Sequence, residues 1–193
     1  TSVPLVEDIQ WHIGYDDSVK KIIGSLQPLG SNYTETLEKG LLEDRWVDRY
    51  ESKGKRSGAY SSGCYDSNPF ILMNYQEDNI NSMYTLAHEA GHSMHSFLSR
   101  ETQPYLYADY TIFVAEVAST FNEALLTKYL LSQDISQNMK IYLICREIDN
   151  LRGTLYRQTM FAEFEHQIYA SAEDNEPMTL EVFKEIYKNL LEK

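Results

Sequence analysis

The sequence has few cysteines and no long apolar run. Cys64 and Cys145 are its only cysteines. They are too few for a disulfide framework and lack the spacing of a metal-binding pair, so we expect two reduced thiols in a cytosolic protein. No segment approaches the about 18 consecutive apolar residues that span a bilayer, and no secretory signal opens the chain. The sequence therefore predicts a cytoplasmic protein with no membrane partner.

Positive charge is also scarce. Lys and Arg number 17 against 29 Asp and Glu, which gives a formal net charge of −12 and a pI of about 4.8. Such a surface repels phosphate backbones and anionic lipid headgroups, so the charge argues against nucleic acid and membrane surfaces as partners. The apolar fraction of 42% is that of an ordinary globular protein, and 193 residues are enough to bury a sizeable core.

Most of the sequence has the periodicity and the capping residues of helices. The helices expected from these patterns span about residues 16–26, 31–50, 80–99, 110–131, 136–170 and 180 onward. Short strands are expected at residues 59–62 and 70–75, with a turn at 66–69 between them. The predicted fold class is therefore mainly α with a small β element.

Residues 85–95 contain the motif His-Glu-x-x-His inside one of the expected helices. His88 and His92 are four residues apart, so they lie on one helix face, where two imidazoles can bind one Zn²⁺ at about 2.0–2.1 Å. Glu89 is rotated about the axis and can hold a metal-bound water without being a ligand. Zinc lowers the pKa of that water to about 7, and the carboxylate can take its proton as the water attacks a peptide carbonyl. The motif predicts one zinc ion per chain in a metallopeptidase, with Glu89 as general base.

A catalytic zinc usually has three protein ligands, so we expect a third on a neighbouring helix. Glu116 is the candidate. It stands in the apolar stretch 112–118, which should face a core, where an unpaired carboxylate is costly. Glu123 lies two turns further along the same face and could accept the second ring proton of a ligand histidine. Ser119 could also contribute.

Other interpretations of these residues stay open at this point. The two motif histidines could simply be packed or solvated, and Glu116 could form an ordinary ion pair. His95 is expected to be packed or hydrogen-bonded rather than a ligand, and no motif surrounds His12 or His166. Gly91 costs about 1 kcal/mol inside a helix relative to Ala. Either the helix tolerates this cost or, as we expect, Gly91 leaves room for an element packed closely over the site.

Several segments together resemble the oligoendopeptidase F group of the thimet oligopeptidase-like (M3) metallopeptidases. They are residues 88–95 (HEAGHSMH), 113–120 (FVAEVAST), 45–50 (RWVDRY), 54–60 (GKRSGAY) and 157–165 (RQTMFAEFE). The separation between His88 and Glu116 is longer than in thermolysin-like enzymes, whose glutamate follows sooner. The resemblance covers essentially the whole chain.

The resemblance implies a zincin-like helical catalytic core with the zinc at the bottom of a deep channel, which admits short peptides and excludes folded proteins. By position, His88, His92 and Glu116 match the zinc ligands of the family, and Glu89 matches its catalytic base. The segment Gly58-Ala59-Tyr60 resembles the strand along which the substrate backbone pairs.

The segment Gly58-Ala59-Tyr60 could equally form a simple glycine turn.

The resemblance also implies that the chain is part of a longer enzyme. The sequence starts at Thr1 without an initiator Met and stops at Lys193 in an apparently helical stretch. We expect a single domain over residues 1–193, with helices and short strands in 1–77 and the zinc-site helices in 78–193. The family's N-terminal lobe and its oxyanion-stabilising His and Tyr would lie outside this fragment. The alternative function is therefore a zinc-binding fragment that is inactive without those missing segments.

Overall fold

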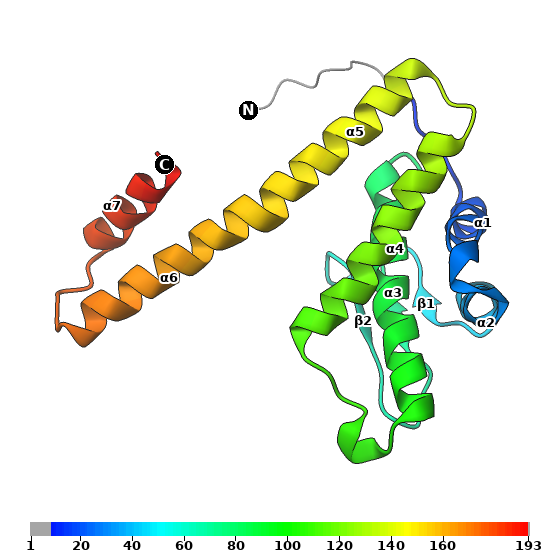
Figure 1. Cartoon of the computed structure of the whole chain (residues 1–193), viewed down its shortest axis with the longest axis horizontal. Helices are drawn as coiled ribbons and strands as arrows, with labels where there is room; N and C mark the ends of the chain where they lie inside the picture. Colours follow the sequence, from blue (N-terminus) through cyan, green and yellow to red (C-terminus); the bar gives the residue numbers. More distant parts are fainter. Residues whose placement is uncertain (1–8, 193) are drawn as a thin grey trace. The chain divides into compact units, whose positions relative to one another are not determined.

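The computed structural model describes residues 9–192 and shows a mainly α-helical protein with one small sheet (Figure 1). The first part of the chain contains the helices α1 (Tyr15–Ser25), α2 (Ser31–Leu42), α3 (Ile80–Thr102) and α4 (Ile112–Ser132). The strands β1 (Val47–Asp48), β2 (Tyr60–Ser62) and β3 (Phe70–Leu72) lie between α2 and α3 in the sequence. The second part contains α5 (Gln137–Leu151), the π-helical segment η3 (Arg152–Tyr156), α6 (Arg157–Glu173) and α7 (Leu180–Leu191). The predicted fold class is confirmed.

The chain divides into two compact units, one of them Asp8–Ser136 and the other containing Gln137–Lys193. In the second unit, α5, η3 and α6 follow one another without a break (Figure 1), close to the long helix predicted for 136–170. The candidate site lies wholly within the first unit. The single domain expected over residues 1–193 stays a prediction.

Among the described residues, no helix combines the length and the apolar character that a bilayer crossing requires.

Helix α3 forms the centre of the first unit. Its residues Met83, Leu86, Ala90 and Met94 recur every three or four positions and are fully buried, which is the spacing of a helix face that packs against its neighbours. Burying one large apolar side chain of this kind stabilises the fold by about 1.5–3 kcal/mol. The helix that carries the His-Glu-x-x-His motif is therefore held firmly on the side opposite to its polar residues.

Helix α2 ends at Leu42, whereas the sequence pattern predicted a helix through residue 50. Arg45 adopts a left-handed backbone conformation with φ 57°, which ends the helical path. The Trp46 ring then folds back over Gly40, where a Cβ atom would lie only 2.3 Å from the indole. The apolar periodicity was interpreted correctly as far as Leu41, but Trp46 is buried from a loop.

The sheet has the strand order β1-β3-β2. Strand β1 pairs with β3 in parallel, with Val47 opposite Ile71, and β2 pairs with β3 in antiparallel, with Ser61 opposite the same residue. The two strands predicted from the sequence are present but shorter, and β1 lies in the region predicted as helix. Because β2 is an edge strand of this sheet, one side of its backbone has no strand partner among the described residues. The Ser61 hydroxyl is 2.8 Å from the Ser93 hydroxyl of α3, so β2 lies against the motif helix.

Candidate metal centre

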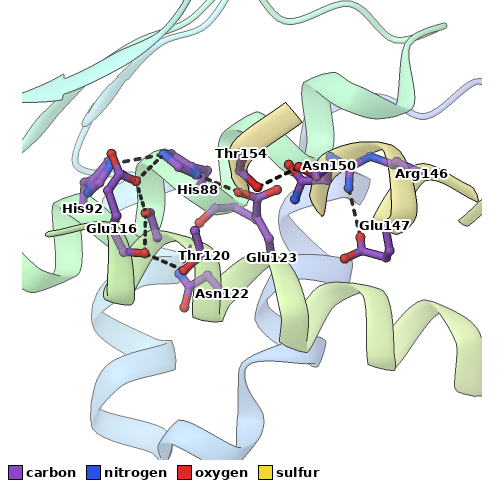
Figure 2. A network of polar contacts seen from close by, with 12 residues as sticks. His88, His92, Glu116, Thr120, Asn122, Glu123, Arg146, Glu147, Asn150 and Thr154 are labelled. Atoms are coloured by element: carbon purple, nitrogen blue, oxygen red, sulfur yellow. Dashed lines mark hydrogen bonds and ion pairs between the residues drawn. The ribbon is translucent and has the colours of Figure 1, made fainter. Parts of the chain in front are cut away.

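Helix α3 presents His88 and His92 one turn apart, as the motif spacing requires. Their Nε2 atoms are 3.1 Å from each other. The ring planes are inclined by 84°, with the centroids 4.7 Å apart. Figure 2 shows both rings pointing to the same point in front of α4. Two imidazole nitrogens therefore converge from one helix.

Helix α4 adds the carboxylate of Glu116 to this pair. Its Oε2 atom lies 3.4 Å from Nε2 of His88 and 3.7 Å from Nε2 of His92. A tetrahedral zinc with ligand distances of 2.0–2.1 Å has ligand atoms about 3.3–3.4 Å apart, so the three separations suit one such ion. Among the described residues, these three form the one group of His, Cys, Asp or Glu side chains that could hold a metal ion.

Gly91 makes the close approach of α3 and α4 possible. A Cβ atom at this position would lie 2.7 Å from the carbonyl oxygen of Ala118 and 2.7 Å from Cα of Ser119. These are backbone atoms of α4, which cannot move aside as a flexible side chain could. The expectation that Gly91 leaves room for a closely packed element is therefore confirmed, and that element is the helix that carries Glu116.

Two further side chains orient two of the three candidate ligands, and Figure 2 shows one of them, Glu123, beside His88. Nδ1 of His88 lies 2.7 Å from Oε1 of Glu123. When the imidazole proton is on Nδ1, it is donated to this carboxylate, and Nε2 stays free to bind a metal. The Ser119 hydroxyl donates to Oε2 of Glu116 at 2.8 Å. The structure thus brings Glu123 and Ser119 to the site, each beside a different one of the candidate ligands.

Burial and nearby charges act differently on the two histidines. Burial acts to lower the pKa of His88, but the hydrogen bond and charge of Glu123 and the charges of Glu89 and Glu116 outweigh it, so the pKa is raised. Burial lowers the pKa of His92, and the neighbouring His88 lowers it further, against smaller opposite effects that include the backbone carbonyl of Ala115. His92 is thus inclined to be neutral, which is the state that binds a metal.

Glu89 stands beside the three candidate ligands but is not part of their group. Its side chain is almost buried, with 7% exposed. Burial raises the pKa of the carboxyl, and the charge of His88 and a hydrogen bond from the backbone N–H of Ser61 partly oppose this rise. A carboxylate with a raised pKa accepts a proton more readily, which suits a general base. The backbone of β2 therefore contacts the residue to which the motif assigns proton transfer.

The structure also shows a buried residue that the sequence analysis missed. Asn122 of α4 is buried, and its amide donates to the backbone carbonyl of Ala87 at 3.2 Å. The same side chain exchanges hydrogen bonds with the Tyr33 hydroxyl of α2. Asn122 therefore connects α4 to α3 immediately before His88. The available signal was its position three residues after Ser119, on the same face of an otherwise apolar helix.

The stretch around Glu116 is more exposed than predicted. The stretch 112–118 was expected to face a core, but Phe113 is 78% exposed and only Ala115 is buried there. The Glu116 side chain is itself 45% exposed. Apolar composition predicts burial only where a partner covers the helix face, and no described residue of the first unit covers this one. The case for Glu116 therefore rests on its distance from the two histidines.

The remaining candidates lie outside the group of three. The His95 ring stacks on Tyr110 at 3.8 Å between centroids, in agreement with a packed histidine. Only Tyr60 of the Gly58-Ala59-Tyr60 segment belongs to β2. Gly58 precedes the strand with φ 89°, a conformation that favours glycine. The segment therefore combines a glycine turn with the start of the edge strand.

Two other histidines, His12 and His166, are not members of the group of three. Nε2 of His12 lies 3.4 Å from Oε2 of Glu77, and the His12 side chain is mostly exposed. His166 is exposed on α6.

The chain is similar to proteins of one known peptidase family. Residues 15–193 match peptidase family M3. The chain is 50% identical over 190 residues to oligopeptidase PepF of Bacillus subtilis, which covers 98% of this chain and 28% of that protein. It is 47% identical over 191 residues to the oligoendopeptidase F homolog of Borreliella burgdorferi, with 99% of this chain and 32% of that protein covered.

A crystal structure of a Chlamydophila abortus protein has the same fold. Its TM-score is 0.79 at 46% sequence identity, over 97% of this chain and 31% of that one. The chain thus spans less than a third of the length of each of these three relatives. The family match covers nearly all of the chain, and the resemblance to oligoendopeptidase F is confirmed. This chain belongs to peptidase family M3.

Proposed function

We propose that this chain is the zinc-binding catalytic core of a metalloendopeptidase that hydrolyses short peptides. The observation that supports this most strongly is the group formed by Nε2 of His88, Nε2 of His92 and Oε2 of Glu116, whose separations of 3.1–3.7 Å suit a single zinc ion. Two imidazoles and a carboxylate are also a donor set found in catalytic zinc sites, which leave one position open.

In this proposal Glu89 moves the proton. A zinc ion at such a site supplies Lewis acidity, which makes water a stronger nucleophile and polarises the carbonyl of the scissile bond. Glu89 takes the proton of the attacking water and passes it to the leaving nitrogen. Its low exposure and raised pKa support this role. Glu123 keeps the His88 ring in the required tautomer, and Ser119 holds the Glu116 carboxylate.

The substrate backbone is proposed to pair with the edge of β2 that has no strand partner among the described residues. This strand continues the segment Gly58-Ala59-Tyr60. An extended peptide can add a strand to an exposed sheet edge, because its backbone supplies the missing hydrogen bonds. A pocket of about 590 Å³ lies at the start of this strand and is lined by Gly58 and Ala59, together with Ser82 and Thr85 of α3. A peptide along β2 would therefore run from this pocket past Glu89.

The second candidate function is a zinc-binding chain that has little activity alone. The chain spans 28% and 32% of the two curated relatives. The resemblance to oligoendopeptidase F implies that the groups that stabilise the oxyanion lie in parts of the enzyme outside these 193 residues. Loss of such a donor typically lowers kcat about 10²–10³-fold. For both candidates we propose a cytoplasmic location, since two cysteines without a disulfide are typical of proteins from a reducing compartment.

Four measurements test these proposals. Zinc content after dialysis should be about one equivalent per chain, and it should fall well below half in a variant with both His88→Ala and His92→Ala. The full-length protein that contains this chain should cleave a quenched fluorescent peptide of about eight residues. The same peptide, offered to the isolated chain, separates the first candidate from the second. Activity that survives Glu89→Gln would overturn the assignment of the base.

A further inference from the structure

A second pocket lies beyond the metal centre, and no role has been given to it. Its volume is about 500 Å³. The end of α3 contributes Ser96 and Arg100 to its lining, and the rest is mostly aromatic or apolar. Those other lining residues are Tyr65, Tyr105, Leu106, Ala108, Asp109 and Tyr110.

The two pockets and the proposed general base lie in a row along α3. Ser82, Glu89 and Ser96 follow one another at seven-residue intervals, which places them on one face of the helix. Ser82 lines the first pocket and Ser96 lines the second. At about 1.5 Å per residue, the helix rises about 27 Å between Ser82 and Arg100. An extended peptide rises about 3.3 Å per residue, so about eight residues would reach from one pocket to the other.

Strand β2 follows the same path beside α3 (Figure 1). Gly58 and Ala59 line the first pocket, Ser61 contacts Glu89, and Arg100 donates from Nη2 to the carbonyl of Gly63 at 3.1 Å. A peptide that pairs with the edge of β2 is therefore led from the first pocket, past the metal centre, to the second.

The wall of the second pocket is held by internal contacts. The Tyr110 hydroxyl lies 2.5 Å from the Ser96 hydroxyl, and its ring stacks on His95. The Tyr65 hydroxyl donates to the carbonyl of Gln103 at 2.8 Å, and its ring packs edge-on against Tyr105 at 5.4 Å. A pocket fixed in this way can select the side chain that enters it.

We propose that this pocket binds an apolar or aromatic side chain of the peptide substrate, three to four residues from the scissile bond. The inference depends on the proposed peptidase function. The distance follows from the eight or so helical positions between the centre of the motif and the middle of the pocket, a rise of about 12 Å. The chemistry follows from its three tyrosines and one leucine; Arg100 and Asp109 add one charge of each sign to the lining.

The test measures binding rather than turnover. In the full-length protein, the Glu89→Gln variant binds a peptide without cleaving it, so a fluorescein-labelled octapeptide with Leu at both ends gives a Kd by anisotropy. Adding Tyr105→Ala to this variant should raise the Kd about tenfold. Leu106→Ala should also raise it. Two control peptides are the octapeptide with Ser at both ends and the tetrapeptide that forms its centre. Each should bind equally well to the Glu89→Gln variant with and without Tyr105→Ala.

Tyr107→Ala is the matched control. Tyr107 and Tyr105 belong to the same short turn and are each 72% exposed, but only Tyr105 lines the pocket. Tyr107→Ala should leave all three Kd values unchanged. The inference is overturned if Tyr105→Ala weakens all three peptides equally, or none of them. Failure of the wild-type protein to cleave the octapeptide would instead count against the proposed function, since binding is measured separately.

Discussion

The contact between His88 and Glu123 leads to a prediction at the scale of single residues. Glu123→Gln keeps the size of the side chain but removes the charge that holds a proton on Nδ1 of His88. Zinc affinity should fall about 10–100-fold, as measured by competition with a chromophoric chelator. Glu35→Gln makes the same charge change at an exposed position of α2 and should have no effect. An affinity of Glu123→Gln within twofold of the wild type would contradict the role given to Glu123.

The raised pKa of His88 predicts how zinc binding depends on pH. The ring must be neutral to bind metal, and its pKa lies above the ordinary value of 6.5. Protons therefore begin to compete with zinc at a pH above 6.5, and affinity falls as the pH is lowered through this raised pKa. In Glu123→Gln the largest raising cause is lost, so the fall should begin at a lower pH. Zinc titrations from pH 6 to pH 8.5 check this, and superimposable profiles of the two proteins would disprove it.

Sequence reasoning reached the site residues unequally. His88, Glu89 and His92 were predicted because helical spacing alone fixes their relation. Glu116 was chosen partly from an expected burial that the structure does not show, and its distance to the histidines depends on the crossing of two helices. Asn122 was missed, because its position on the Ser119 face of α4 does not reveal the tertiary hydrogen bond to the carbonyl of Ala87.

The crossing of α3 and α4 gives a prediction at the scale of elements. Gly91→Ala places a methyl group 2.7 Å from backbone atoms of α4, so the helices must separate and carry Glu116 away from the histidines. Overpacking of this kind typically destabilises a fold by about 1–3 kcal/mol. We expect a lower midpoint in urea unfolding and a zinc affinity reduced at least tenfold.

A second helical glycine provides the control for that experiment. A Cβ atom at Gly153 would meet nothing within 4 Å, and its backbone is not left-handed. Gly153→Ala should therefore leave zinc affinity unchanged and could stabilise the helix by up to about 1 kcal/mol. If Gly91→Ala behaved in the same way, the close crossing would not be what sets the geometry of the site.

The elements themselves were predictable where they are long and periodic. The helix predicted at 80–99 is observed at Ile80–Thr102, and the one at 110–131 is observed at Ile112–Ser132. The end of α2 and the two-residue strand β1 were not foreseen, since the left-handed backbone of Arg45 and the pairing of β1 with β3 leave no mark in the apolar pattern. Short strands gain their stability from partners distant in sequence, so local pattern carries little information about them.

At the scale of the whole molecule, two properties of the chain oppose each other. Helix α4 exposes a group of large apolar side chains, which favours association with other surfaces. The members of this α4 face are Ile112, Phe113, Val117 and Phe121. The net charge of −12 keeps copies of the chain apart. Charge repulsion between separate molecules is screened over about 10 Å at 0.1 M salt, whereas apolar attraction is not, so salt decides which property prevails.

The isolated 193-residue chain should therefore bind the apolar dye anilinonaphthalene sulfonate, and its self-association should increase from 20 mM to 300 mM salt. Replacing Phe113 and Phe121 with Ser should reduce both signals, because each is more than half exposed and contributes its ring to the α4 face. Phe70→Ser removes a ring exposed on the sheet and should have a much smaller effect. Dye fluorescence and light scattering give the two readouts. Association that decreases with salt would show that opposite charges, rather than the α4 face, hold the copies together.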